Sequence, residues 1–252
     1  MCTFIVLYRP DHPWPILIAA NRDEMHDRSW QPPGRHWPDR PSVVAGLDHL
    51  GRGSWFGLND SGVVAGIMNR RNTLGPVAGK RSRGELVLKA LDYADAQAAA
   101  DSLSHTDAAY YRAFNLVIAD NKGAYWLRHT EADSQTRIDV KKLPPGLSMI
   151  TAYDCNDISS SRVRRYLPLF LTAPVPDPER IYWSGWTALL ACRESDPDAG
   201  PEGAMNIVTN HGFGTVSSLL LALPARERIG VKPRWLFAAG RPDIVPFNDV
   251  MF

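Results

Sequence analysis

The sequence predicts a layered α+β protein, because strand-like and helix-like segments occur in separate blocks along the chain. Apolar, β-branched runs typical of strands lie near both ends, which suggests that the two ends enter the same sheets. Helical periodicity begins only after Ser82 and returns in the last third of the chain. With 252 residues, of which 44% are hydrophobic, the chain has enough apolar side chains for a sizeable core.

Each expected element follows from a local pattern of residues. Strands are expected at 3–8, 15–20, 43–46, 54–58, 63–68, 114–119, 124–129, 147–152, 215–223 and 234–238. Helices are expected from Ser82, at 94–103, at 160–171 and at 186–192. The segment Ser82-Arg83-Gly84-Glu85 has the form of a capping box for the first helix. The proline-rich stretch 25–41 contains two tryptophans, so we predict an ordered loop there rather than a linker.

Charge and cysteine content exclude several classes of function. The 28 basic and 27 acidic residues leave a net charge of +1, which gives no overall field for nucleic acid or an anionic membrane. The local basic runs 80–83 and 162–165 are most simply solvated faces, with a phosphate ligand as the minority alternative. The three cysteines and seven histidines have neither disulfide-type nor zinc-type spacing. No segment has the features of a signal peptide or a membrane span, and we expect a soluble, cytoplasmic protein.

Cys2 stands directly before the first expected strand and is the main candidate for a reactive group. If Met1 is removed, this residue has both a thiol and a free α-amine, whose unperturbed pKa of about 7.7–8.0 allows it to accept the thiol proton. If Met1 is retained, the amine becomes an unreactive amide. Cys2 would then be a small hydrophobic residue at the start of a strand.

Several motifs along the chain resemble one protein family. The N-terminal Met-Cys-Thr, a hairpin, and then Asn21-Arg22-Asp23-Glu24 are similar to the NRDE family, the transport-and-Golgi-organisation type two proteins. The similarity spans almost the whole chain and continues through Arg28-Ser29-Trp30, Trp37-Pro38, residues 53–59, residues 62–65, Asn69-Arg70-Arg71, residues 80–86 and residues 213–218. The first 90 residues give the most specific part of the match.

This resemblance implies a four-layer αββα sandwich, in which two antiparallel sheets lie between helical layers, as in N-terminal-nucleophile hydrolases. It also implies that residues 1–252 form a single domain. In that fold the first strand places the nucleophile, here Cys2, at the mouth of a cleft between the sheets. Asp23 would orient the Cys2 amine, and Asn69 would bind the substrate or the oxyanion. Asn69 is also a normal turn residue, so both interpretations stay open.

Two positions depart from the hydrolase pattern that the resemblance implies. Ala20 stands where the arginine before Asn21 is expected, and Arg22 cannot replace it because adjacent strand residues point to opposite faces. Ala152 stands where a second amide is expected, although Asn156 in the following loop could substitute. A complete set of hydrolase residues is therefore not demonstrated.

The remaining candidates would bind a ligand. Asn21, Arg22 and Glu24 would line the cleft beside Cys2, or would form a polar strand end with surface ion pairs. Trp55 is one of four tryptophans in the first 55 residues that could line an apolar cleft or anchor the core. His211 could meet a ligand or lie on the surface.

Two functions remain open, and whether the protein is an enzyme is undecided. We favour binding and trafficking of a hydrophobic small molecule, either haem or an acyl or lipid-type ligand, near Cys2, because the resembled family is implicated in such roles. The alternative is a Cys2-dependent amide or acyl hydrolase, or an acyltransferase. No cofactor or metal is required in either case, although haem could be the transported ligand. We expect no nucleic-acid partner and no stable membrane insertion, and the oligomeric state stays open.

Overall fold

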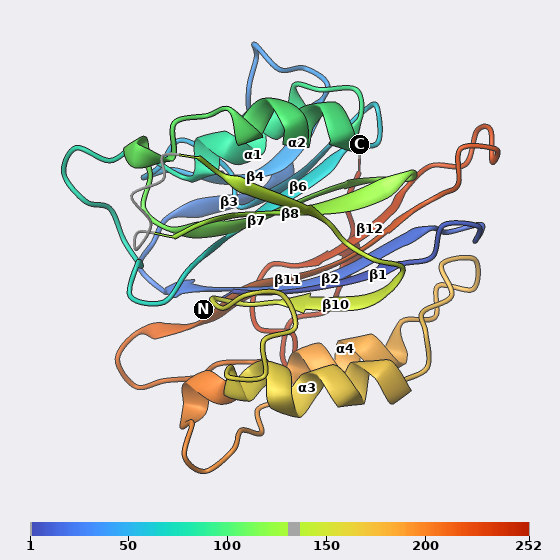
Figure 1. The fold of residues 1–252 in the computed structure, drawn as a ribbon. Coiled ribbons are helices and arrows are strands. Elements are labelled where there is room, and N and C mark those ends of the chain that lie inside the picture. Colours follow the sequence, from blue (N-terminus) through green and yellow to red (C-terminus); the bar gives the residue numbers. More distant parts are fainter. Residues whose placement is uncertain (1, 131–136, 252) are drawn as a thin grey trace. The chain divides into compact units, whose positions relative to one another are not determined.

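The computed structural model describes residues 2–130 and 137–251 and contains two antiparallel sheets, each covered on one face by a pair of helices (Figure 1). The chain divides into two compact units. The described part of the first comprises residues 2–27 and 145–250, and that of the second comprises residues 28–130 and 137–144 with Met251. Whether the chain acts as a single domain stays a prediction.

The first unit contains both end regions of the chain in one six-stranded sheet of order β10-β1-β2-β11-β12-β13. Its strands are β1 (Thr3–Tyr8), β2 (Ile16–Met25), β10 (Gly146–Ile150), β11 (Phe213–Leu223), β12 (Arg234–Ala238) and β13 (Asn248–Asp249). The helices α3 (Ser161–Thr172) and α4 (Ser184–Ala191) cover one face of this sheet, and a short 3₁₀ helix spans Pro201–Gly203. The prediction that both end regions enter the same sheet is confirmed.

Alternation along β1 and β2 determines which side chains face the helices. Ile5 on β1 and Ala19 on β2 are paired across the strands, and both belong to the buried cluster that contains Val163 of α3 and Trp186 of α4. Odd-numbered residues of β1 and β2 therefore point toward the helices, and even-numbered residues point to the other face.

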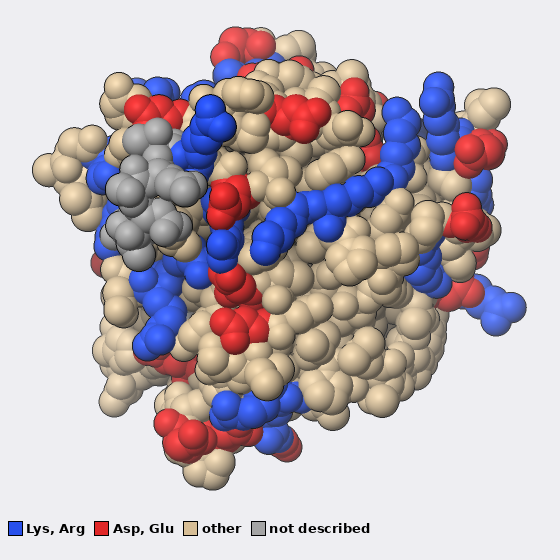
Figure 2. All heavy atoms as spheres, viewed as in Figure 1, with Lys and Arg blue, Asp and Glu red and all other residues tan. Residues whose placement is uncertain are grey.

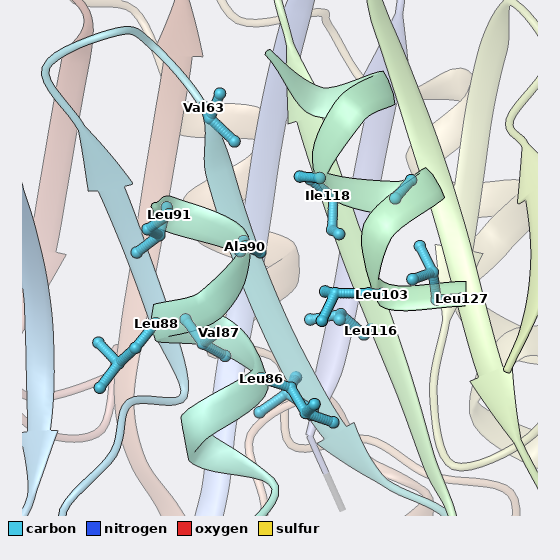
Figure 3. Close-up of a cluster of buried hydrophobic side chains, with 14 of the residues drawn as sticks. Val63, Leu86, Val87, Leu88, Ala90, Leu91, Leu103, Leu116, Ile118 and Leu127 are labelled. Carbon is cyan, nitrogen blue, oxygen red and sulfur yellow. The ribbon is translucent and has the colours of Figure 1, made fainter. Parts of the chain in front are cut away.

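The second unit has a seven-stranded sheet of order β3-β4-β5-β6-β7-β8-β9. Its strands are β3 (Trp30–Gly34), β4 (Val43–Asp48), β5 (Phe56–Asn59), β6 (Val64–Asn69), β7 (Phe114–Asp120), β8 (Gly123–His129) and β9 (Asp139–Lys142). Its helices are α1 (Gly84–Leu91), α2 (Ala96–Ser104) and a 3₁₀ turn at Ala108–Tyr110. Figure 3 shows Leu86, Val87 and Leu103 of the helices beside Leu116 and Leu127 of β7 and β8 in one buried cluster.

Two local predictions in this unit are wrong. The helix α1 begins at Gly84 with Arg83 at the N-cap position and without the predicted capping box. Ser82 Oγ accepts the backbone N–H of Gly84 at 3.3 Å, but Glu85 forms an ion pair with Arg81 and a hydrogen bond with Tyr111 instead of reaching back. The predicted loop at 25–41 contains the edge strand β3, whose register shifts around Pro32 and Pro33. An edge strand tolerates prolines because only one side needs backbone donors.

Figure 2 shows the distribution of charge on one face of the molecule. On the face shown in Figure 2, basic and acidic side chains are interspersed among large uncharged areas. Among the described residues, no helix is long and apolar enough to cross a membrane.

Candidate functional site

Cys2 lies directly before β1, at the open end of the hairpin that β1 and β2 form in the first unit. Its Sγ points at the backbone oxygen of Asp23 at 3.6 Å, and the residue is half-buried. Because Thr3 pairs with Asn21, the antiparallel register places Cys2 across from Arg22. The structure therefore brings the predicted Cys2 and the polar end of β2 together.

The carboxylate of Asp23 lies in a buried hydrogen-bond network on the helix side of the sheet. One oxygen accepts the hydroxyl of Thr215 at 2.7 Å, and the other accepts Arg162 Nη1 at 3.1 Å. Arg162 also donates to Thr3 Oγ1 at 2.6 Å and to the backbone oxygen of Glu202 at 2.7 Å. Asp23 and Arg162 are 1% and 3% exposed, so both charges are almost completely desolvated. This network fixes the ends of β1, β2, β11 and α3 to one another.

The prediction that the basic run 162–165 is a solvated face is wrong for Arg162. Arg164 is exposed and pairs with the partly buried Asp196, and the half-buried Arg165 pairs with the exposed Glu194, but Arg162 is on the buried face of α3. The signal was present in the sequence. Arg162 shares the helical spacing of Tyr166 and Phe170, both fully buried, and this spacing predicts an inward orientation. Arg162 thus supplies a cation beside Asp23 even though Ala20 stands at the position where the arginine was expected.

The side-chain amide of Asn21 hydrogen-bonds to groups of the protein itself. Its amide donates to the backbone oxygens of Leu190 and Met205, both at 2.9 Å, and its oxygen accepts the hydroxyl of Ser218 at 2.6 Å. These bonds join the sheet to the end of α4 and to the segment before β11. That Asn21 contacts a ligand stays a prediction.

Arg22 and Glu24 lie on the face of β2 opposite to Asn21 and Asp23, and both are buried. The Oε1 atom of Glu24 accepts the backbone N–H of Met25 at 3.0 Å. His211 is exposed in the turn that leads into β11, whose Phe213 pairs with Met25. These three candidates therefore cluster at the same end of the first unit as Cys2.

Burial raises the pKa of the Cys2 thiol above its ordinary value, and the negative charge of Asp23 raises it further. The positive charge of Arg22 acts in the opposite direction but more weakly. The thiol is therefore protonated at neutral pH. Because the folded state holds this proton more tightly than the unfolded chain, ionisation of Cys2 decreases stability as the pH rises above the ordinary thiol pKa.

We expect Cys2 to react with iodoacetamide at a higher midpoint pH in the native chain than in the denatured chain. Alkylation depends on the thiolate, whose population falls when the pKa rises. Peptide mass spectrometry across the alkaline range measures the midpoint, with the half-buried Cys155 and Cys192 as internal references. A native midpoint at or below the denatured one would contradict the inferred environment.

Asn69 and Trp55, the other two candidates, belong to the second unit. Asn69 is the half-buried last residue of β6 and pairs with Phe114. Trp55 packs edge-on against Trp30 with ring centroids 5.5 Å apart. A Cβ atom on Gly46 would lie 2.2 Å from the Trp55 ring, so the ring fills the space over this glycine. Trp55 has the contacts of a core anchor, and its predicted contact with a ligand remains untested.

Asn156 forms two hydrogen bonds with the end of β10. Its Oδ1 accepts the backbone N–H of Met149 at 2.7 Å, and its own N–H donates to the Met149 oxygen. Ala152 is buried nearby in sequence and offers no polar atom on its side chain. Throughout residues 2–130 and 137–251, no three His, Cys, Asp or Glu side chains are grouped so that they could hold a metal ion.

A sequence model of the family described as Transport and Golgi organisation 2 matches residues 1–165. The chain belongs to this family. It is the NRDE family that the motifs predicted, so the resemblance is confirmed. A comparison with curated proteins gives no significant match.

Solved structures share the fold of this Transport and Golgi organisation 2 protein at low sequence identity. An N-acylethanolamine-hydrolyzing acid amidase ortholog from Caenorhabditis elegans is 14% identical, with a TM-score of 0.56 over 87% of this chain and 92% of that one. A mutant conjugated bile acid hydrolase from Clostridium perfringens is 10% identical, with a TM-score of 0.52 over 100% and 97%. Penicillin V acylase from Agrobacterium tumefaciens is 12% identical, with a TM-score of 0.50 over 94% and 83%. The predicted α+β sandwich of the N-terminal-nucleophile hydrolase type is confirmed.

Proposed function

We propose that this protein binds and carries a hydrophobic small molecule with an anionic end, either haem or an acyl or lipid-type ligand, beside Cys2. The observation that supports binding over catalysis is the position of the Asp23 carboxylate. Each of its oxygens already accepts a hydrogen bond, from Thr215 or from Arg162, on the helix side of the sheet. A carboxylate that pairs with a buried cation in this way holds the strands in place. It is poorly placed to orient an amine as the third member of a catalytic triad.

The electrostatics of Cys2 support the same proposal. A thiol whose pKa is raised by burial is a weak nucleophile at neutral pH. A protonated cysteine behaves as a small hydrophobic residue with a weak S–H donor, so it is well suited to contact an apolar ligand. Arg22 lies across from it and provides a positive charge. A propionate of haem or the carboxylate of an acyl compound fits that charge, and the apolar body of either ligand matches the hydrophobic class proposed here.

Titration of the full chain with haemin and with palmitate tests this proposal. Haemin binding is followed by the Soret band, and palmitate binding by displacement of a fluorescent fatty acid. We expect one of the two to bind saturably, with Arg22→Gln weakening it about tenfold and the exposed Arg226→Gln leaving it unchanged. Thermal unfolding of both variants verifies that they are folded. The absence of saturable binding for both ligands would overturn the proposal.

A second candidate, a Cys2-dependent amide or acyl hydrolase, is favoured by the half-buried thiol that opens β1 in a fold shared with amidases and acylases. Cys2 would attack the acyl carbonyl to form a thioester and release the amine or alcohol, and water would then release the acid. Met1 lies outside the described residues, and intact-mass measurement of the native protein determines whether the amine is free.

Cys2→Ala distinguishes the two functions. A binding protein is expected to keep its affinity within about threefold, because the thiol makes one contact among many. A hydrolase is expected to lose turnover of every small amide and ester completely. Turnover by the native chain that disappears in Cys2→Ala would establish the second candidate.

A further inference from the structure

The first unit has a surface cavity of about 490 Å³ at the opposite end of β1 from Cys2. It lies where the turn between β1 and β2 meets the segment 175–179 and Arg228. Because β1 has six residues at about 3.3 Å each, roughly 20 Å separates this cavity from the thiol. Its volume is in the range of small-molecule sites, and the buried Trp14 and Pro176 give it apolar walls.

Arg9 is a partly buried cation without an acidic partner in this cavity. Its Nη2 donates to the backbone oxygen of Trp14 at 3.3 Å. Its Nε is buried and, within the described part of the chain, hydrogen-bonds to nothing. Burial lowers the pKa of Arg9, as expected for a charge that has lost water without gaining a counter-charge. A guanidinium in this state is costly unless an anion approaches it.

The two carboxylates of the cavity have hydrogen-bond and ion-pair partners other than Arg9. Glu179 accepts the indole N–H of Trp14 at 2.8 Å and forms an ion pair with Arg228 at 2.5 Å. Asp177 accepts the backbone N–H groups of residues 179 and 180 and lies 3.6 Å from the guanidinium of Arg180. The positive charge of Arg9 therefore stays available to a ligand.

His12 and Arg228 offer further donors. The backbone N–H of Trp14 donates to His12 Nδ1 at 3.0 Å, so the neutral ring holds its proton on Nε2. Burial, followed by the charge of Arg9, lowers the pKa of His12 and keeps the ring neutral. Arg228 stacks over Trp14 at 4.9 Å, and its Nη1 is also buried without a hydrogen-bond partner among the described residues. The cavity thus combines an aromatic wall with several N–H donors and one uncompensated charge.

We propose that this cavity is a second ligand site, distinct from the Cys2 site, and that it binds a small organic carboxylate. The carboxylate pairs with Arg9, and its apolar body lies against Trp14 and the proline-rich segment 175–179. A carboxylate fits better than a phosphate, because one uncompensated guanidinium balances a single negative charge.

Calorimetric titration of the full chain with 3-phenylpropionate, 3-phenylpropanamide and inorganic phosphate tests the proposal. We expect saturable binding of the carboxylate and binding about tenfold weaker, or absent, for the uncharged amide. Arg9→Gln is expected to weaken carboxylate binding about tenfold, and the exposed Arg226→Gln, on the same loop as Arg228, is expected to leave it unchanged. Equal affinity for acid and amide, unchanged binding by Arg9→Gln, or saturable binding of phosphate without binding of the carboxylate would overturn the proposal.

If Arg9→Gln does not fold, the NMR signals of His12 in the unmodified chain still test the proposal. The ring proton signals of His12, identified by their loss in His12→Gln, are expected to shift with the carboxylate concentration in the unmodified chain. Saturable binding that leaves these signals in place would assign the carboxylate to another site and overturn the proposal.

Discussion

Replacing Arg162 with methionine is expected to lower the free energy of unfolding by about 3–5 kcal/mol. The substitution preserves most of the side-chain volume but leaves the Asp23 carboxylate buried without its cation. It also removes donors from Thr3 and from the backbone oxygen of Glu202. The decrease is measured by urea denaturation, as a change in midpoint at constant slope.

Two further variants separate this explanation from general damage to α3. Arg164→Met lies two positions away, where the guanidinium pairs with Asp196 at the surface, and it is expected to cost at most about 1 kcal/mol. Adding Asp23→Asn to Arg162→Met removes the buried negative charge that has lost its cation, and it is expected to restore part of the lost stability. If the double variant is less stable than Arg162→Met alone, the buried-charge explanation is wrong.

Replacing Asn21 with alanine is expected to cost roughly 2–5 kcal/mol of unfolding free energy. The change leaves the backbone oxygens of Leu190 and Met205 without their side-chain donor and Ser218 without its acceptor, all in a buried region. Equilibrium unfolding in urea gives the difference.

The matched control for Asn21 is Asn210→Ala, which changes an exposed asparagine and is expected to alter stability by less than about 0.5 kcal/mol. Ser218→Ala removes only one of the three bonds and should cost about 1 kcal/mol. Equal stability of Asn21→Ala and Asn210→Ala would mean that the amide of Asn21 does not join the sheet to α4.

Most of the fold could be predicted from the sequence, because buried strands have strong local patterns. The runs at 3–8 and 234–238 coincide with β1 and β12, and the hairpin around residue 121 coincides with β7 and β8. β2 extends to Met25, beyond the apolar run, because its polar residues from Asn21 onward continue to pair with β11. Pairing with a distant strand leaves no local signature, so this extension could not be predicted from the residues themselves.

The candidate site could be predicted only in part. Proximity of Cys2 to the end of β2 followed from the hairpin, and the structure places the two together. Arg162 and Thr215 were not predicted as part of the site around Asp23, because they come from α3 and β11, which are far from Asp23 in the sequence. A run of basic residues predicts a single exposed surface. On a helix, however, one residue of the run points inward and the others point outward.

The order of synthesis has a consequence for how this protein reaches its native state. The hairpin of β1 and β2 is synthesised before β10 and β11, yet Asp23 and its partner Thr215 are 192 positions apart. Until β10 and β11 have been translated, both outer edges of this hairpin lack their neighbours and can pair with foreign strands. A shortened polypeptide that stops at residue 165 never acquires β11, so we expect it to aggregate or to be held by chaperones, even though it retains every residue of the family match.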